Sequence, residues 1–251
     1  MSKKTVLVTG GSKGIGHATA ELLLERGFRV IVLARDAGRL KQIRDDFIDA
    51  GHNELDIEVH ALDMADVEQI ESVVFKCKLL QDGLFGLVSN AAVEILKPGM
   101  KFSLDELEQT WKVNILGPIR MMQVCYPFLK KQKGSIVHIG SVSDFHCDAN
   151  YSVYGGSKAF MKGFVGHAAQ EMGPDGVRIN IVSPGATDTP LMQHFIDKGQ
   201  WSQEEISQFK KTIPMEQRFA TSREIAEAVS FALTGPRFFH GEDIRIYGGH
   251  K

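Results

Sequence analysis

The sequence predicts an α/β protein with a Rossmann-type, doubly wound sheet of about seven parallel strands in a three-layer α/β/α arrangement. Short β-branched runs alternate with longer segments of helical periodicity, which is typical of parallel sheets with helices on both faces. Residues 28–33 are almost continuously apolar, as expected for a strand that is covered on both faces. A glycine-rich turn separates the first predicted strand from the first predicted helix.

The individual elements follow from their local patterns. Strands are expected at residues 6–9, 28–33, 55–61, 84–89, 135–140, 177–182 and 244–247. Helices are expected at residues 15–26, 37–50, 65–80, 103–129, 152–172 and 222–233. The helix from Ser103 begins with Ser-Leu-Asp-Glu, a capping-box pattern. Residues 186–219 interrupt the alternation and contain Trp201, so we expect them to cover a substrate site.

The composition is that of an ordinary globular protein, and we expect one domain over residues 1–251. Hydrophobic residues make up 43% and charged residues 24%, and the net charge of −2 favours neither nucleic acid nor membrane as a partner. No apolar run reaches the ~20 residues that span a bilayer. The three cysteines form no Cys-x-x-Cys pair, which fits a reducing, cytoplasmic location. The nine histidines show no ligand spacing, so we expect no metal site.

The glycine-rich turn lies where a dinucleotide would bind. Its spacing, G-x-x-x-G-x-G, differs from the common G-x-G-x-x-G, and an ordinary tight turn is the alternative. Between a first strand and a helix, however, glycines let the backbone approach a pyrophosphate, and the helix N-terminus offers free N–H groups. The turn residues predicted to bind the dinucleotide are Gly10, Ser12, Lys13, Gly14, Ile15 and Gly16.

The end of the second strand predicts which dinucleotide is used. A carboxylate at this position usually binds the ribose of NAD(H), but here the position is Ala34, followed by Arg35. Lys13 adds a second cation, and two cations favour the 2′-phosphate of NADP(H) over NAD(H). The alternative is that both cations are solvated and Asp36 takes the ribose hydroxyls.

A Ser, a Tyr and a Lys form the candidate catalytic group. Tyr154 and Lys158 are four residues apart and share one face of a predicted helix, and Ser141 ends the fifth strand. A tyrosine is a weak base at neutral pH, but a neighbouring ammonium favours the phenolate and lowers the tyrosine pKa. Ser141 can hold a substrate oxygen by a hydrogen bond. The three groups suit proton transfer to or from an alcohol.

These motifs resemble the short-chain dehydrogenase/reductase family over nearly the whole chain. The resemblance implies that Tyr154 and Lys158 also bind the cofactor and that Asn114 completes the catalytic set. It adds the cofactor contacts Asp63, Met64, Asn90, Ala91, Ala92, Pro184, Gly185, Thr187 and Thr189. Ala92 replaces the glycine of the family's Asn-Ala-Gly motif. Glu94 follows where the family often lines the substrate pocket; it is either a solvated loop charge or a selector of polar or cationic substrates.

Pro118 suggests a proton relay. It lies four residues after Asn114 and has no N–H to donate to the Asn114 carbonyl, which is then free to hold a water. In the family, a water at this position links the lysine to solvent. A simple helix kink is the alternative.

The resemblance implies an NADP(H)-dependent oxidoreductase that interconverts a ketone or aldehyde and an alcohol. The stretch 139–143 resembles 3-oxoacyl-carrier-protein reductases, and Lys130, Lys131 and Lys133 could meet an acidic carrier. A steroid or other bulky ring ketone, a sugar or polyol, a small secondary metabolite and a non-catalytic NADP(H) sensor remain alternatives. The family commonly forms homotetramers or homodimers through the helices expected at 103–129 and 152–172. Four apolar residues are compatible with such an interface, although they could equally belong to the core: Phe160, Met161, Phe164 and Val165.

Overall fold

The computed structural model describes residues 3–250 and contains one seven-stranded parallel sheet, which confirms the predicted fold class. The strand order is β3-β2-β1-β4-β5-β6-β9. The strands are β1 (Thr5–Thr9), β2 (Arg29–Ala34), β3 (Ile57–Ala61), β4 (Gly86–Ser89), β5 (Ser135–Ile139), β6 (Arg178–Pro184) and β9 (Asp243–Ile246). The order reverses between β1 and β4, and ligands of such sheets bind beyond the carboxyl ends at this point.

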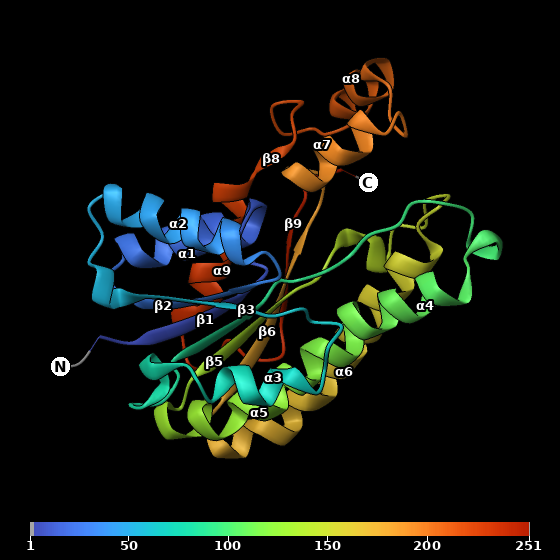
Figure 1. The fold of residues 1–251 in the computed structure, drawn as a ribbon. Helices are drawn as coiled ribbons and strands as arrows, with labels where there is room; N and C mark the ends of the chain where they lie inside the picture. Colours follow the sequence, from blue (N-terminus) through green and yellow to red (C-terminus); the bar gives the residue numbers. More distant parts are fainter. Residues whose placement is uncertain (1–2, 251) are drawn as a thin grey trace.

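Helices cover both faces of the sheet (Figure 1). One layer consists of α1 (Gly14–Glu25), α2 (Ala37–Asp49) and α9 (Ser222–Thr234), and the other of α3 (Gln69–Val74), α5 (Gly117–Gln132) and α6 (Ser152–Met172), with α4 (Leu104–Trp111) packed on α6. Short 3-10 helices lie in the connections: η1 (Glu54–Asp56), η2 (Lys78–Leu80), η3 (Gly99–Lys101), η5 (Val142–Asp144) and η6 (Gly173–Asp175).

The segment between β6 and α9 stands beyond the carboxyl edge of the sheet, in orange and red at the top of Figure 1. It contains α7 (Pro190–Asp197) and α8 (Gln203–Lys211), and the two-residue strands β7 (Thr187–Asp188) and β8 (Ala220–Thr221) pair with each other at its two ends. We call residues 186–219 the cover segment. Its own small core contains Ile206, Ile213 and Phe219.

Alternation along the strands divides the main core into two halves. Leu7 of β1 packs with Ile31 of β2 against the layer that contains α5 and α6. Val6 and Val8 point to the opposite face and pack against the layer of α1, α2 and α9. Because both faces are buried, the strands are apolar at consecutive positions, which is why the sequence showed continuous rather than alternating apolar runs.

The helix predicted at residues 65–80 is much shorter, because neighbouring side chains hold its backbone in turns. Asp63 accepts a hydrogen bond from the Ala65 N–H at 2.9 Å, which forms a turn before α3. After α3, the Glu58 carboxylate accepts hydrogen bonds from the N–H groups of Lys78 and Leu79. These contacts compete with the helical ladder at both ends, so only residues 69–74 remain α-helical.

The helix predicted at residues 103–129 is interrupted by a π turn, η4 (Lys112–Leu116), between α4 and α5. The Gly117 N–H binds the Lys112 carbonyl, five residues earlier, instead of a carbonyl four residues earlier. A side chain at Gly117 would overlap the Met64 carbonyl, so only glycine permits this approach. Such turns are frequent at functional sites.

None of the helices within residues 3–250 is both long and apolar enough to cross a membrane.

Candidate active site

One large cavity of about 580 Å³ opens at the carboxyl ends of the strands. It brings together nearly all of the predicted site residues, from the glycine turn, the ends of β2, β4, β5 and β6, helix α6 and the cover segment. Those that line it are Gly10, Ser12, Lys13, Gly14, Ile15, Arg35, Asp63, Met64, Asn90, Ala91, Ala92, Ser141, Tyr154, Lys158, Pro184, Gly185, Thr187 and Thr189. Gly16 and Asn114 support the cavity from outside.

The glycine turn is held tightly against the end of β4. Gly10 has a φ of +65°, and an added Cβ would lie 2.9 Å from the Ala91 Cα. A methyl at Gly16 would overlap the Gly10 carbonyl oxygen. The Asn90 side-chain amide donates hydrogen bonds to the carbonyls of Thr9 and Gly10, at 3.0 and 3.1 Å. The glycines therefore permit a compact backbone that larger residues would force apart.

Helix α1 presents its N-terminus to the cavity. Lys13 occupies the N-cap position without a side-chain cap, and Gly14 follows with a φ of +56°. The first N–H groups of α1 therefore keep their hydrogen-bonding capacity, and the helix dipole places positive charge at the same point. An anionic diphosphate fits this end of the cavity.

Two cations stand at the same end. Lys13 and Arg35 both line the cavity and are exposed, and within residues 3–250 neither forms an ion pair. Asp36 does not line the cavity; its carboxylate instead caps α2 by accepting a hydrogen bond from the Arg39 N–H at 2.9 Å. The carboxylate that could have bound ribose hydroxyls is thus engaged elsewhere.

The remaining predicted cofactor contacts lie around this end. Asp63 has one carboxylate oxygen in its turn with Ala65. The Thr187 hydroxyl donates to the Gly185 carbonyl at 3.0 Å. Thr189 caps α7 by accepting a hydrogen bond from the Met192 N–H at 3.3 Å, and its side chain approaches Gly14. The beginning of the cover segment therefore lies close to the glycine turn.

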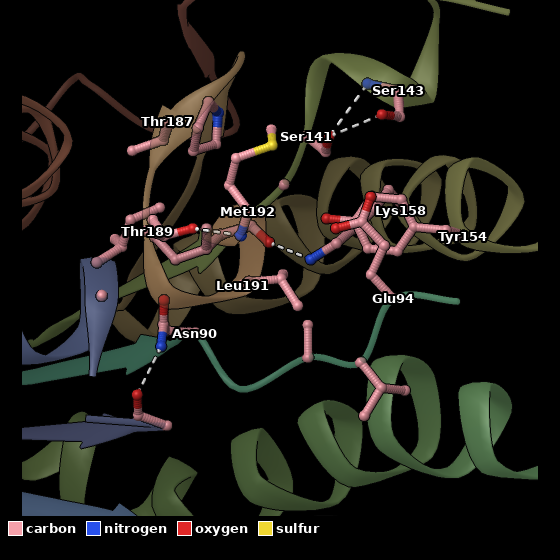
Figure 2. Close-up of a pocket in the computed structure, with 18 of the residues that line it drawn as sticks. Asn90, Glu94, Ser141, Ser143, Tyr154, Lys158, Thr187, Thr189, Leu191 and Met192 are labelled. Carbon is pink, nitrogen blue, oxygen red and sulfur yellow. Dashed lines mark hydrogen bonds between the residues drawn. The ribbon is translucent and has the colours of Figure 1, made fainter. Parts of the chain in front are cut away.

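Ser141, Tyr154 and Lys158 meet on one wall of the cavity (Figure 2). The Ser141 hydroxyl lies at the end of β5, donates to the Ser143 hydroxyl at 3.1 Å and accepts from the Ser143 N–H at 3.2 Å. Lys158 is buried, and its ammonium donates to the Ile139 carbonyl at 2.8 Å. The same ammonium lies 5.6 Å from the centre of the Tyr154 ring.

The pKa values of this group are shifted mainly by burial. Burial lowers the pKa of Lys158 to about 8, against a smaller opposing effect of Glu94. Burial, helped by the Glu94 carboxylate, raises the pKa of Tyr154 well above its usual value, and contact with Ser141 only partly opposes this. The sequence-based expectation that Lys158 lowers the tyrosine pKa is therefore wrong for the chain alone, because burial penalises the phenolate more strongly.

Asn114 lies behind the cavity wall. Only 2% of it is exposed, and its side-chain oxygen accepts a hydrogen bond from the Val93 N–H at 2.9 Å. Its amide nitrogen donates to the Val93 carbonyl and to the Ser157 hydroxyl. The side chain thus ties the loop after β4 to helix α6. Its backbone belongs to the π turn, and Pro118 offers the Asn114 carbonyl no N–H.

Glu94 lies in the same loop and points toward Tyr154 and Lys158 (Figure 2). Within the described part of the chain its carboxylate accepts no hydrogen bond and pairs with no cation. Burial raises its pKa to about 7, although Lys158 opposes the shift. Glu94 is therefore a cavity group and not the solvated loop charge that the sequence left open.

The sequence reasoning missed the aromatic lining that the cover segment and the C-terminal tail supply. Phe209 of α8 packs edge-on against Trp201 and against His250, with ring centres 5.5 and 5.0 Å apart. The Met215 N–H also donates to the Gly248 carbonyl at 3.1 Å. Only Trp201 had drawn attention in the sequence. Tyr247 and His250 also line the cavity, and no local pattern reveals that the tail returns to it.

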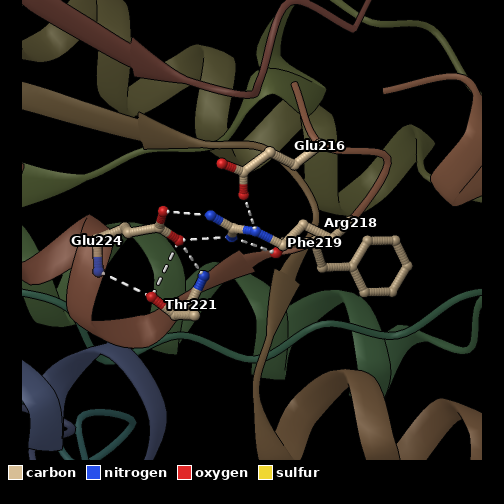
Figure 3. A network of polar contacts seen from close by, with 5 residues as sticks. All are labelled: Glu216, Arg218, Phe219, Thr221 and Glu224. Carbon is tan, nitrogen blue, oxygen red and sulfur yellow. Dashed lines mark hydrogen bonds and ion pairs between the residues drawn. The ribbon is translucent and has the colours of Figure 1, made fainter. Parts of the chain in front are cut away.

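The far end of the cover segment is fixed by Arg218 (Figure 3). Its guanidinium binds both carboxylate oxygens of Glu224, at 2.7 and 2.8 Å, and the carboxylate of Glu216. Glu224 belongs to the capping box that begins α9 with Thr221. The cover segment is therefore attached to the helix layer at its end and lies beside the glycine turn at its beginning.

Glu58, His60 and Cys77 are the one group of potential metal ligands found among residues 3–250. Their own contacts account for their proximity. Glu58 accepts hydrogen bonds from two backbone N–H groups and contacts the His60 ring at 2.7 Å. Burial raises the pKa of the Cys77 thiol to about 12, so it does not offer a thiolate at neutral pH.

Of the four apolar residues of α6 that the sequence left open between a contact face and the core, most belong to the core. Met161 and Val165 are buried in the core and cannot reach another chain. Phe164 is partly buried against the same core. Phe160 remains 44% exposed and packs on Trp111, which is 48% exposed, with ring centres 5.5 Å apart.

A family model described as short chain dehydrogenase matches residues 4–200. The 3-oxoacyl-[acyl-carrier-protein] reductase FabG of Aquifex aeolicus is 32% identical, over 98% of this chain and 96% of its own. Glucose 1-dehydrogenase of Gluconobacter oxydans is 31% identical, over 98% of this chain and 91% of its own. The solved structure of ElxO with NADP bound has a TM-score of 0.88 at 28% identity and covers 99% of both chains.

Proposed function

The chain belongs to the short-chain dehydrogenase/reductase family, and we propose that it reduces a ketone or aldehyde to an alcohol with NADPH, with Tyr154 as the general acid. The observation that carries the proposal is the position of Tyr154, Ser141 and Lys158 on one wall of a cavity whose other end holds the glycine turn. Neither group of residues would be enough for this reaction alone. A glycine turn by itself indicates only nucleotide binding, and a Tyr-Lys pair by itself indicates only proton transfer.

The residues that line the cavity fit the dinucleotide. The uncapped N-terminus of α1 and the compact turn around Gly10 suit its diphosphate, and Asp63 can accept a hydrogen bond from its adenine. When bound, the nicotinamide ring supplies or accepts the hydride. Lys158 is placed to bind the nicotinamide ribose, as the family resemblance implies.

The chain's own groups handle the proton. The raised pKa of Tyr154 keeps its phenol protonated at neutral pH, so it can donate a proton to the alkoxide that forms on reduction. The Ser141 hydroxyl orients the same oxygen. Lys158, with a pKa of about 8, can return a proton toward Tyr154. The Asn114 carbonyl, to which Pro118 offers no N–H, can hold the water that links Lys158 to solvent.

Two observations support NADP(H) over NAD(H). Lys13 and Arg35 find no ion-pair partner among residues 3–250 and stand at the end of the cavity, and Asp36 is committed to capping α2. A 2′-phosphate would meet both cations, whereas the end of β2, where a carboxylate usually binds the ribose hydroxyls of NAD(H), carries Ala34. Structures of similar chains contain NADP, among them ElxO and a short chain dehydrogenase of Burkholderia cenocepacia.

The second candidate is a 3-oxoacyl-thioester reductase, which the Aquifex aeolicus relative favours. The lysines expected to meet an acidic carrier do not support it. Lys130, Lys131 and Lys133 lie at the end of α5, just before β5 begins, and therefore at the opposite edge of the sheet from the cavity. Lys130 is also paired with Asp175 at 2.9 Å.

A comparison of two tyrosine variants tests the proposal. With NADPH and a panel of ketones, Tyr154→Phe should lower kcat by about 10²–10⁴-fold, the usual contribution of one acid–base group. Tyr126→Phe is the matched control, since the Tyr126 hydroxyl binds Asp175 away from the cavity, and it should retain turnover. Full turnover in Tyr154→Phe would overturn the mechanism. If NADPH binds but is not oxidised in the presence of any ketone of the panel, a sensor is favoured.

We also propose that the chain forms a homo-oligomer, as family members commonly do. The exposed pair Trp111 and Phe160 on α4 and α6 is the apolar surface that such a contact would cover.

A further inference from the structure

The substrate end of the cavity is acidic as well as aromatic. Glu94 comes from the loop after β4, and Asp148 from the loop before α6; both line the cavity. The two loops are neighbours, because the Lys97 N–H donates to the Asn150 carbonyl at 3.3 Å. Within residues 3–250, neither carboxylate forms a hydrogen bond or an ion pair. Two unpartnered carboxylates therefore stand on one side of the cavity.

The lysines in this region do not neutralise them. Lys97 is paired with Glu106, and Lys162 with Asp144 and Asp243. Lys158 is the cation that faces Glu94, and its ammonium is already hydrogen-bonded to the Ile139 carbonyl. When Glu94 is ionised, two carboxylates outweigh one ammonium and this end of the cavity is negative, in contrast to the cationic end around Lys13 and Arg35.

Aromatic side chains line the same cavity as the two carboxylates. Tyr151 lies beside Tyr154, with ring centres 6.4 Å apart. Burial raises the pKa of Tyr151, and Glu94 and Asp148 add to the shift, so both carboxylates are near its hydroxyl. The cover segment closes over the same loop, because the Gln200 side chain donates to the Leu96 carbonyl at 3.3 Å and brings Trp201 to the cavity wall. Carboxylates combined with aromatic faces are the usual surroundings of a bound ammonium group.

A carboxylate at this position is unfavourable for a neutral substrate. The Glu94 charge opposes negative charge on the Tyr154 oxygen, and it opposes an alkoxide next to that oxygen in the same way. An ammonium group on the substrate would offset this effect and would also give Glu94 the partner that it lacks among residues 3–250.

We propose that the substrate is an amino ketone or amino aldehyde, whose protonated nitrogen binds between Glu94 and Asp148 while its carbonyl oxygen meets Ser141 and Tyr154. This deepens the proposed function and rests on it. It excludes keto carboxylates as preferred substrates, and it makes Glu94 the main specificity-determining residue, since Asp148 is exposed and its charge is better screened.

The first test compares three ketones of matched length with NADPH: a tertiary-amino ketone, its isostere in which a C–H group replaces the protonated nitrogen, and a keto carboxylate. The amino ketone should have the highest kcat/KM and the keto carboxylate the lowest. Glu94→Gln should lower the ratio of amino ketone to isostere by roughly ten- to hundredfold, the usual loss when a charge-assisted hydrogen bond is removed. Asp148→Asn should lower it less.

The control is Glu68→Gln, which removes a carboxylate that does not line the cavity and should leave the ratio unchanged. A second readout is binding of the corresponding amino alcohol, measured by calorimetry in buffers of different ionisation enthalpy. At pH 7 the ligand should displace protons from Glu94, whose pKa is about 7, and Glu94→Gln should abolish this release.

The outcomes separate the two proposals. Equal use of the isostere and the amino ketone, preference for the keto carboxylate, or an unchanged ratio in Glu94→Gln would overturn the amino-ketone proposal and leave the reductase proposal intact. Absence of NADPH oxidation with all three ketones and with the wider ketone panel would overturn both.

Discussion

Replacing Gly10 by Ala tests whether the glycine turn depends on close backbone packing or only on left-handed geometry. Gly10 and Gly27 both have positive φ, +65° and +81°, so alanine at either site incurs the left-handed penalty of about 1–2 kcal/mol. Around Gly27, none of the residues that the structure describes lies within 4 Å of an added Cβ. At Gly10 the Cβ would lie 2.9 Å from the Ala91 Cα, and this backbone is held by a 3.1 Å hydrogen bond from the Ala91 N–H to the Thr9 hydroxyl.

Because Ala91 cannot easily move, Gly10→Ala should lower the free energy of unfolding by a further ~1–3 kcal/mol, the usual range for overpacking. The expected total loss in the free energy of unfolding is therefore about 2–5 kcal/mol, against about 1–2 kcal/mol for Gly27→Ala. Urea unfolding measures both, and NADPH fluorescence titration should show weaker binding only for Gly10→Ala, since Gly27 does not line the cavity. Equal losses of stability, with equal NADPH affinity, would refute the packing argument.

Four further predictions concern the cofactor, the catalytic lysine, the cover segment and the helix surface. Arg35→Asp should lower the kcat/KM ratio of NADPH to NADH by at least about tenfold; an unchanged ratio would exclude Arg35 as a phosphate contact. Lys158→Met should raise the free energy of unfolding at pH 7 by on the order of 1–3 kcal/mol, measured by urea unfolding. The pKa of Lys158 is about 8 in the folded chain and about 10.5 in the unfolded chain, so at pH 7 folding buries a charged ammonium at a cost. That gain should fade as pH rises from about 8 to above 10.5, and a gain that persists would contradict the burial argument. Arg218→Ala should raise the KM of the carbonyl substrate more than that of NADPH in steady-state kinetics, whereas equal changes would show that the cover segment acts on both. Phe160→Glu should reduce the oligomeric state in analytical ultracentrifugation, and a wild-type chain that is already monomeric would disprove the proposed contact.

Much of the fold could be predicted because its signals are local. Helix α6 begins and ends at the predicted residues 152 and 172, and the strands agree to within about two residues, because buried parallel strands produce short apolar runs. Helix α3 could not be predicted in length. The Glu58 carboxylate that fixes the chain after it lies twenty residues away in sequence, and no helical pattern encodes such a contact.

The candidate site also has a part that local sequence signals predict and a part that they do not. Gly10, Ser141 and Lys158 stand at strand ends or on one helix face, so the topology alone brings them to the cavity. The pKa of Tyr154 could not be predicted, since it depends on the burial of the ring and on Glu94 from another loop. His250 could not be predicted either, because it reaches the cavity through tail contacts with the cover segment.

The π turn at Lys112–Leu116 has a consequence for relatives of this chain. Such a turn amounts to one extra residue inserted in a continuous helix, and each residue of an α-helix advances the chain by about 100°. A homologue that lacks this residue would present a different side of α4 to α6. Its residue at the position of Trp111 would no longer contact the position of Phe160, whereas its residue at the position of Asn114 would keep the same hydrogen bonds. In an alignment of this chain with such a homologue, a one-residue gap in the middle of this helix would then indicate that the two proteins expose different residues of α4, although their catalytic residues occupy the same positions.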